Sequence, residues 1–376
     1  MTPRSARVLF FFSLLPTTML PQQGNATGTV SGHIYCSDTN LPARLIRVTL
    51  LRVPEPVTDD SAAKLNPHDP FASVSGTTRI DGSFLISRVP PGTYYVSAEQ
   101  PGYLTPYSLF PGAELLHPTS EMRSLIAKSV PTISVVASKT SVVDVSLQRG
   151  GSISGVIRYD DGSPVSNTTA LPLRRDKKGK WADDLDNMGY TDDLGRFRIT
   201  GLPAGEYTVS IGLSAPDTAG NYNGKPLAIY YGDGFREADA KAIKIGEGED
   251  SSGDDITIRL AKLHTIVGSL IDSSGHVINA GDVILYTDPD NIEITGAHVE
   301  PDDSAFHFDF VPEGNYVIRV PNARDVSAQT VSYPNGQFGP PKVNETISKS
   351  YGLYEAPLVV VGDVSGLTIT IPAKLK

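Results

Sequence analysis

The sequence predicts an all-β protein made of three tandem β-sandwich domains of the immunoglobulin-like or prealbumin-like kind, preceded by a signal peptide. The 376-residue chain contains 35 glycines and 29 prolines. A helical protein would not tolerate so many, because both residues break helices and mark turns. A proline-glycine-tyrosine motif also recurs at a spacing of roughly one small domain. Its three copies are RVPPGTYYVSA (88–98), GLPAGEYTVSI (201–211) and FVPEGNYVIRV (310–320).

Each copy of the motif keeps its proline, glycine and tyrosine at the same offsets. The residues are Pro90, Gly92 and Tyr94, then Pro203, Gly205 and Tyr207, then Pro312, Gly314 and Tyr316. Proline fixes φ and glycine permits a sharp bend, so the motif predicts a corner at which the chain passes from one sheet to another. The tyrosine starts the next strand, where its ring can pack against the edge of the sandwich.

The first residues are typical of a secretory signal peptide. Arg4 and Arg7 precede an apolar run from Val8 to Leu15, and small residues follow near Ala26. We expect residues 1–26 to be removed and the remaining chain to be exported, to the periplasm, the cell surface or the extracellular space. No second apolar run follows, so we expect no transmembrane segment in the mature chain.

The three sandwiches are predicted at residues 27–149, 150–262 and 263–376. Each begins with a strand pattern that has a glycine at its centre, and such a glycine indicates a bulge or the close approach of another backbone. These glycines are Gly32, Gly155 and Gly268.

The middle and the end of each repeat also have the pattern of strands. Apolar residues two positions apart in the middle strand should face one core. They are Phe84 and Ile86, Phe197 and Ile199, and Phe306 and Phe308. Closing strands are expected at 143–147, 255–260 and 367–371. No segment has a convincing amphipathic helical period, so each one-sided strand should bury its apolar face against a second sheet.

The order of these motifs resembles the carboxypeptidase regulatory-like domain, a prealbumin-like or transthyretin-like β-sandwich related to the collagen-adhesin B-type repeats. The second repeat matches best, from Thr191 to Val209, and the third is the most diverged. Tyr230-Tyr231-Gly232 is similar to the exported bacterial versions of these tandem arrays. The resemblance covers nearly all of the mature chain. It implies a fold and no activity, since the shared residues are turn and core residues.

The composition argues against several partners and cofactors. A net charge of −10 disfavours nucleic acid and anionic membranes, which need concentrated Lys and Arg. Cys36 is the only cysteine and is expected to be a small buried residue in a strand. None of the seven histidines begins an H-x-x-E or H-E-x-x-H pattern. We therefore expect no metal, no cofactor and no enzyme activity.

Two groups of residues are candidates for a site. Clustered carboxylates are interpreted as solvated turn residues, because no spacing matches a calcium loop. They are Asp160-Asp161, Asp183-Asp184, Asp192-Asp193, 247–255 and Asp302-Asp303. Aromatic residues of the second repeat could form a sugar-stacking platform, although aromatics more often serve packing. They are Trp181, Tyr190, Tyr222, Tyr230 and Tyr231.

The preferred interpretation is a non-catalytic exported array that acts as a structural or interaction module at the cell surface or in the periplasm. Its partner would be another exported protein or a polysaccharide. A carbohydrate-binding protein with a starch-binding-like fold is the first alternative. An enzyme of unrecognised type is the second, and it would need a cleft of titratable groups that the sequence does not reveal.

Overall fold

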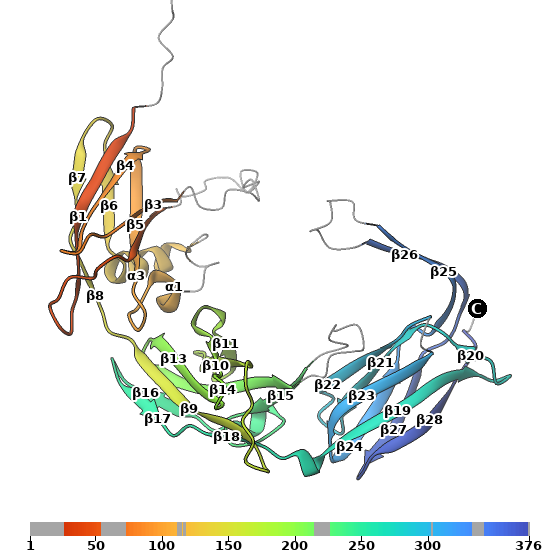
Figure 1. Ribbon diagram of the computed structural model, residues 1–376. Coiled ribbons are helices and arrows are strands. Elements are labelled where there is room, and N and C mark those ends of the chain that lie inside the picture. The colour runs from red at the N-terminus through yellow and green to blue at the C-terminus, as the bar shows by residue number, and fades with distance from the viewer. Residues whose placement is uncertain are drawn as a thin grey trace, which may run out of the picture. The chain divides into compact units, whose positions relative to one another are not determined.

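The computed structural model describes residues 26–53, 73–110, 115, 118–213, 226–301, 304–332 and 342–374. Almost all of the regular structure in this part of the chain is β-strand, which confirms the predicted all-β class (Figure 1). The predicted signal peptide lies outside the described residues except for Ala26.

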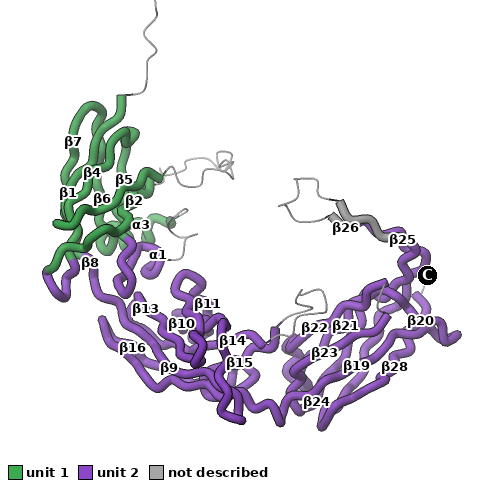
Figure 2. Tube along the Cα trace, viewed as in Figure 1, with its two compact units in different colours: residues 1–35, 41–98, 116–146 green, residues 36–40, 99–115, 147–376 purple. Residues whose placement is uncertain are grey.

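The chain separates into two compact units (Figure 2). The first comprises residues 1–35, 41–98 and 116–146, and the second comprises residues 36–40, 99–115 and 147–376. The second unit contains two pairs of sheets and a further ribbon.

The first unit contains two four-stranded sheets, except for the last residues of β1, β5 and β8, and one helix. One sheet has the order β4-β1-β7, with β8 also paired to β1; its strands are β1 (Gly28–Cys36), β4 (Ser83–Val89), β7 (Thr140–Val142) and β8 (Val145–Leu147). The other has the order β3-β2-β5-β6, with β2 (Arg47–Arg52), β3 (Val74–Thr77), β5 (Gly92–Glu99) and β6 (Thr132–Val135).

The first pair of sheets in the second unit follows the same plan. One sheet has the order β13-β9-β17, with β18 also on β9; its strands are β9 (Gly151–Tyr159), β13 (Arg196–Leu202), β17 (Asp250–Ser252) and β18 (Ile256–Ile258). The other has the order β11-β10-β14-β15. Its strands are β10 (Thr169–Arg175), β11 (Trp181–Asp183), β12 (Gly189–Tyr190), β14 (Gly205–Leu213), β15 (Leu227–Tyr230) and β16 (Ile243–Ile245).

The last pair of sheets adds one element to this plan. One sheet has the order β20-β19-β23 with β28 on β19; its strands are β19 (Leu263–Asp272), β20 (Val277–Ile278), β23 (Ala305–Pro312) and β28 (Val364–Ile371). The other has the order β22-β21-β24-β27, with β21 (Gly281–Thr287), β22 (Glu293–Val299), β24 (Gly314–Val320) and β27 (Tyr354–Val360). The additional element is a two-stranded antiparallel ribbon of β25 (Arg324–Ser332) and β26 (Lys342–Ser350).

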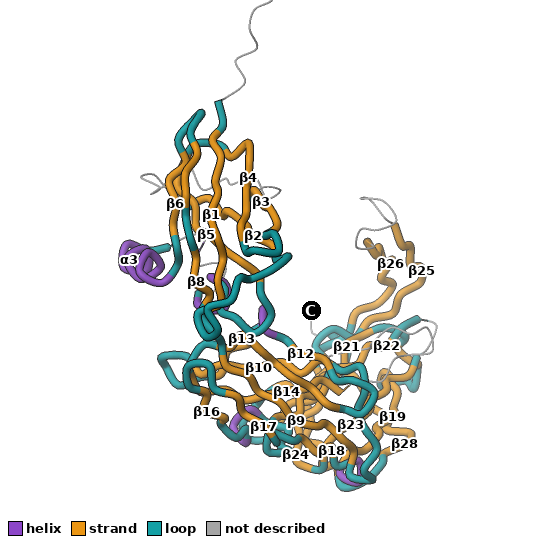
Figure 3. The backbone as a smooth tube through the Cα atoms, turned by 60° about the vertical axis from the view of Figure 1, so that its left-hand side comes forward, coloured by secondary structure: helices purple, strands orange, loops and turns teal. Residues whose placement is uncertain are grey.

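The expectation that no amphipathic helix would occur is wrong for one segment. Helix α3 (Ser120–Ser129) begins at Thr119, whose side chain accepts a hydrogen bond from the amide of Met122. Only Ile126 of this helix is fully buried, so the apolar stripe that would have predicted it is very thin. The other helices whose bounds lie within the described residues are single turns: α1 (Pro106–Leu109), η2 (Leu185–Asn187), η3 (Glu237–Asp239) and η4 (Leu260–Lys262) (Figure 3).

The predicted core residues are buried. The paired apolar positions of the middle strands β4, β13 and β23 are all at most 3% exposed; they are Phe84, Ile86, Phe197, Ile199, Phe306 and Phe308. Cys36 is also buried in β1, as predicted. Because these side chains alternate with exposed neighbours, each sheet presents one apolar face to its partner sheet.

Each proline-glycine-tyrosine motif lies where the chain passes between the two sheets of a pair. The passages join β4 to β5, β13 to β14 and β23 to β24. In each, the tyrosine hydroxyl donates a hydrogen bond to the carbonyl oxygen of the motif's proline, four residues earlier. The pairs are Tyr94 and Pro90 at 2.8 Å, Tyr207 and Pro203 at 2.7 Å, and Tyr316 and Pro312 at 2.8 Å.

The glycine has the positive φ that the motif predicts at only one of the three corners, where Gly92 has φ 153°. Gly205 and Gly314 have no left-handed φ, whereas the residue two positions before each proline does. These left-handed residues are Arg88 (φ 60°), Gly201 (φ 77°) and Phe310 (φ 55°). They coincide with bulges in the strand register. A Cβ at Gly205 would lie 3.1 Å from Nε of Arg174 and 3.4 Å from Cε2 of Tyr207, so the tighter contact would be with the arginine.

The glycine at the centre of each first strand allows a close approach of the closing segment. A Cβ atom on Gly155 would overlap the carbonyl oxygen of Asp254, and one on Gly268 would overlap that of Leu367. The amide of Val156, the residue after Gly155, also bonds to this closing segment: it donates a hydrogen bond to the Asp255 carboxylate at 2.8 Å. Only a residue without a side chain fits between these backbones.

The clustered carboxylates that the structure describes include turn residues of the predicted kind. Asp161 accepts hydrogen bonds from the amide and hydroxyl of Ser163, and Asp192 accepts them from the amides of Leu194 and Arg196. These hydrogen bonds lower the pKa of both carboxyls. Asp302-Asp303 lies outside the described residues.

Candidate functional site

The β25–β26 ribbon is anchored to the last pair of sheets by backbone hydrogen bonds at its base. The amide of Arg324 donates to the carbonyl oxygen of Ala280 at 2.8 Å, and the amide of Ala280 donates back at 3.1 Å. On the other strand, the amide of Tyr351 donates to the carbonyl oxygen of Ala323 at 3.0 Å. These bonds fix the first residues of β25 and the residues that follow β26.

A charged pair ties the two strands of the ribbon together. The Arg324 guanidinium donates from Nε and Nη2 to the Glu345 carboxylate at 2.7 and 2.9 Å, and from Nη1 to the carbonyl oxygen of Asn322 at 3.3 Å. The hydrogen bonds between the two side chains raise the pKa of Arg324 and lower that of Glu345. A guanidinium held at both ends of a carboxylate has a fixed orientation.

One further contact holds the base of the ribbon against the end of β19, and another joins the start of β25 to the residue after β26. Lys349 donates to the Asp272 carboxylate at 2.7 Å, which lowers the pKa of that carboxyl. The hydroxyl of Tyr351 donates to Asp325 at 2.7 Å, and burial raises the pKa of this tyrosine. The ammonium of Lys349 also lies 4.5 Å from the centre of the Tyr351 ring. These contacts fix the base of the ribbon.

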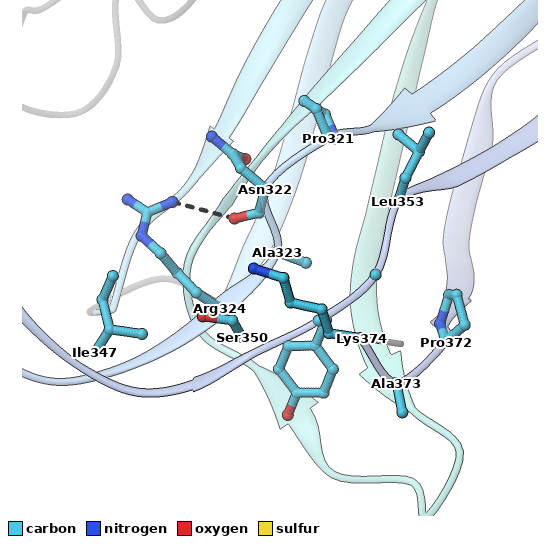
Figure 4. Close-up of a pocket in the computed structure, with 12 residues that line it drawn as sticks. Pro321, Asn322, Ala323, Arg324, Ile347, Ser350, Leu353, Pro372, Ala373 and Lys374 are labelled. Atoms are coloured by element: carbon cyan, nitrogen blue, oxygen red, sulfur yellow. Dashed lines mark hydrogen bonds between the residues drawn. The ribbon is translucent and has the colours of Figure 1, made fainter. Parts of the chain in front are cut away.

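A recess of about 700 Å³ lies beside this base (Figure 4). The lining residues come from the start of β25, the end of β26 and the chain after β28; they are Pro321, Asn322, Ala323, Arg324, Ile347, Ser350, Tyr351, Gly352, Leu353, Pro372, Ala373 and Lys374. Ala323 and Tyr351 are buried and form its floor. The ammonium of Lys374 points toward Ala323 and Arg324, and Leu353 and Pro372 lie on the opposite side.

The lining of the recess is positively charged and otherwise apolar or neutral. It includes two cations, Arg324 and Lys374, and no carboxylate. Arg324 uses three of its five N–H groups in the bonds described above. The carboxylate of Glu345, together with those of Asp282 and Glu300, also raises the pKa of Arg324. The positive charge of the lining is therefore opposed by carboxylates just outside it.

The aromatic residues predicted from the sequence are not brought together. Trp181 and Tyr190 lie in β11 and β12, which both pair with β10. Tyr230 lies in β15, which pairs with β14 at the opposite edge of the same sheet, and the amide of Tyr231 bonds to Val209 of β14. Tyr222 lies outside the described residues.

The environments of these aromatic residues also differ. The guanidinium of Arg175 lies over the Trp181 ring, 4.4 Å from its centre. Tyr190 is 63% exposed. Burial raises the pKa of both Tyr230 and Tyr231. Trp181 lies opposite Arg175 and Tyr190 lies opposite Thr169, at the two ends of β10, so these two residues do not form a common platform either.

The described part of the chain contains neither a cluster of metal ligands nor a membrane helix. Among its residues, no group of three or more His, Cys, Asp or Glu is arranged so that it could hold a metal ion. None of the helices in that part is long and apolar enough to cross a membrane.

Sequence reasoning did not find the recess. Its residues come from three separate stretches of the last repeat, and none of them has a motif of its own. The ribbon itself had a signal, since polar and apolar residues alternate on both sides of the turn-forming Pro334-Asn335-Gly336. That signal predicts a hairpin and gives no indication of what its base would contact.

The sequence matches no family description and no curated protein. Among solved structures, the chain is similar to the streptococcal ancillary pilin (11% identity, TM-score 0.30, 93% of this chain and 100% of that one). It is also similar to a shaft pilin of Lactobacillus rhamnosus GG (13% identity, TM-score 0.24, 61% and 96%). A third similarity is to the Bacillus anthracis TIE protein (15% identity, TM-score 0.21, 92% and 51%), of which the chain spans about half the length. Similarity this distant supports no inference about what this chain does.

Proposed function

We propose that the chain is a non-catalytic, exported structural or interaction module built from three β-sandwich domains, at residues 27–149, 150–262 and 263–376. The structural role of the repeated residues supports this proposal most directly. All three tyrosines of the repeated motif are buried and donate to the same backbone position. The repeated glycines of the first strands, Gly32, Gly155 and Gly268, make room for the backbone of another segment. The pattern repeated within the chain thus serves stability rather than chemistry.

The proposal includes the finer assignments made from the sequence. Residues 1–26 act as a signal peptide, and the domains are members of the carboxypeptidase regulatory-like type. The partner is another exported protein, and the site of action is the cell surface or the periplasm. An acidic surface with a net charge of −10 keeps such a module soluble and apart from anionic polymers.

The test is expression of the whole chain from Met1 in bacteria, beside a variant that lacks residues 1–26. We expect the first form to appear outside the cytoplasm with a new N-terminus near Thr27, and the second to stay in the cytoplasm. Exposure to protease on intact cells then separates a surface location from the periplasm. An uncleaved chain retained in the cytoplasm would contradict the proposal.

A carbohydrate-binding role is the second candidate, and one observation favours it. Trp181 is the only tryptophan of the chain and lies half-buried on an edge strand. An edge aromatic of this kind can stack on a sugar ring. Glycan binding by the full chain and by Trp181→Ala separates the two candidates.

A further inference from the structure

We propose that the closing segment of the second repeat, residues 250–258, is a pH-dependent latch controlled by Asp254. The latch holds strand β9 firmly when this carboxyl is protonated and loosens when it is charged. It comprises β17 and β18, which both pair in parallel with β9, and Asp254 lies between them. The latch goes beyond the proposed function, which requires no response to pH.

The carboxyl group of Asp254 is buried and incompletely paired. The residue is 6% exposed, and its Oδ2 atom is buried with no hydrogen-bond partner among the described residues. A carboxylate oxygen that has lost water and gained no donor disfavours the charged form. Burial accordingly raises the pKa of Asp254; hydrogen bonds from Ser251 and Tyr231 oppose this shift of the pKa, and the charge of Asp255 adds to it.

The cations nearby are engaged with other carboxylates. Asp233 and Asp255 act on the same tyrosine as Asp254 does. Arg259 lies 3.6 Å from the Asp233 carboxylate, and Arg158 of β9 lies 3.6 Å from that of Asp255. Within the described ranges, neither arginine forms an ion pair with Asp254. When Asp254 is charged, it therefore adds a negative charge beside two others and has no cation of its own.

The backbone of Asp254 is clamped, so its side chain cannot easily turn out to water. Its amide donates to the carbonyl oxygen of Ser154 at 3.2 Å. Its own carbonyl oxygen lies against Gly155, where a Cβ atom would be only 2.4 Å away. Two residues further on, Ile256 pairs with Ile157 of β9. The charged form must therefore stay buried or break these contacts, and breaking them loosens the latch.

The other two repeats have an aliphatic residue at this position. In the first repeat, the carbonyl oxygen of Val143 lies against Gly32, and in the third repeat that of Leu367 lies against Gly268. The same close approach of two backbones therefore forms without a carboxyl group. The fold does not require an acid at position 254, and the acid makes the second repeat alone sensitive to protons here.

The sign of the effect follows from the raised pKa. An aspartate in an unfolded chain titrates near pH 4. The stabilisation is therefore complete below about pH 4 and is lost as the pH rises through the raised pKa of the folded state. Carboxyls with a lowered pKa, such as those of Asp161 and Asp192, act in the opposite direction. The contribution of Asp254 must for this reason be measured against a variant that lacks its charge.

The experiment measures hydrogen–deuterium exchange by mass spectrometry, at pH 4 and pH 7, with rates corrected for intrinsic exchange. It uses the full chain purified after expression from Met1. Peptides that cover residues 250–258 report on the latch, and peptides that cover 140–147 report on the equivalent segment around Val143. We expect protection of 250–258 to fall about threefold or more from pH 4 to pH 7, relative to 140–147. Equal changes in the two segments would overturn the proposal.

Three variants assign the effect to one carboxyl. Asp254→Asn keeps the size of the side chain and should remove the extra loss of protection at pH 7. Asp254→Leu copies the third repeat and should do the same, so that a disturbed packing of the amide does not decide the outcome. Asp255→Asn is the matched control one residue on. It should give no gain of protection, because its carboxylate accepts a hydrogen bond from the amide of Val156.

The outcomes separate the latch from a general effect of charge. An equal gain of protection in Asp255→Asn and Asp254→Asn would show that any loss of negative charge stabilises this acidic chain, and it would refute the latch. No gain at pH 7 in either variant of Asp254 would refute it as well. Urea unfolding followed by the fluorescence of Trp181 checks that the variants fold. It should also place the midpoint of Asp254→Asn above that of the natural chain at pH 7, by a difference that shrinks toward pH 4.

Discussion

The hydroxyl of Tyr207 lies 2.7 Å from the carbonyl oxygen of Pro203, to which it donates a hydrogen bond, and the tyrosine ring is completely buried. The bond links Tyr207 of β14 to the turn between β13 and β14, on the buried side of the sandwich. Equivalent bonds at Tyr94 and Tyr316 make it a repeated part of the architecture. The spacing of four residues between donor and acceptor is what the chain preserves from one repeat to the next.

Replacing Tyr207 by phenylalanine should destabilise the sandwich around β14 by about 1 kcal/mol, because the ring remains while the Pro203 carbonyl loses its partner. The measurement is urea unfolding followed by tryptophan fluorescence. Trp181 is the single tryptophan and lies in the same sheet, so the signal reports on this sandwich. Tyr190→Phe is the control, since Tyr190 is 63% exposed. Equal effects of the two variants would show that the buried hydrogen bond contributes nothing.

Replacing Gly268 by alanine should cost about 3 kcal/mol, because the new methyl group overlaps both the Leu367 carbonyl oxygen and the ring of Phe306. Because backbone lies on one side of the new methyl group and a buried ring on the other, neither neighbour can move away easily. Gly362→Ala is the matched control from the same pair of sheets, since a Cβ there meets nothing within 4 Å. Differential scanning calorimetry compares the two variants, and an unshifted transition in Gly268→Ala would contradict the close approach.

The corner tyrosines should make the protein sensitive to alkali. Burial raises the pKa of Tyr207 and Tyr316 to about 12, whereas a tyrosine in an unfolded chain titrates near 10. The unfolded state therefore loses its protons first, so the stabilisation is complete below about pH 10 and falls as the pH rises toward 12.

The measurement for this prediction is the near-ultraviolet absorbance of tyrosinate as pH is raised, in the native chain and in urea. Some of the 16 tyrosines should lose their protons at a higher pH in the native chain than in urea. Tyr207→Phe should remove one late-titrating group. If all tyrosines of the native chain titrated together with those in urea, the buried corners would be ruled out.

The sequence was sufficient for the parts of the fold that depend on local chemistry. Proline followed by glycine and a strand pattern marks a change of direction wherever it occurs, and alternation of Phe197 and Ile199 defines a buried face. Gly155 could be recognised as a point of close approach because a glycine within a strand weakens it and is therefore kept mainly where a side chain would not fit. These features are readable because each is encoded within about ten residues.

Features that depend on distant contacts could not be predicted. The left-handed conformation of Arg88 and Phe310 has no local signal, since neither residue favours it and only the bulge against the facing strand imposes it. Helix α3 was missed because a single residue, Ile126, faces the core. The recess was missed because Arg324, Leu353 and Lys374 meet only after the last repeat has folded.

Trp181→Ala should have no effect on the binding of glycans, because the structure offers no continuous aromatic platform around this residue. Arg175 lies over the Trp181 ring, and Tyr230 is on the opposite edge of the sheet. A glycan array and a pull-down with insoluble polysaccharides, run with the full chain and the variant, provide the measurement. Binding by the full chain that the variant loses would transfer the assignment to a carbohydrate-binding protein with its site on β11. Absence of binding in both would direct the search to protein partners.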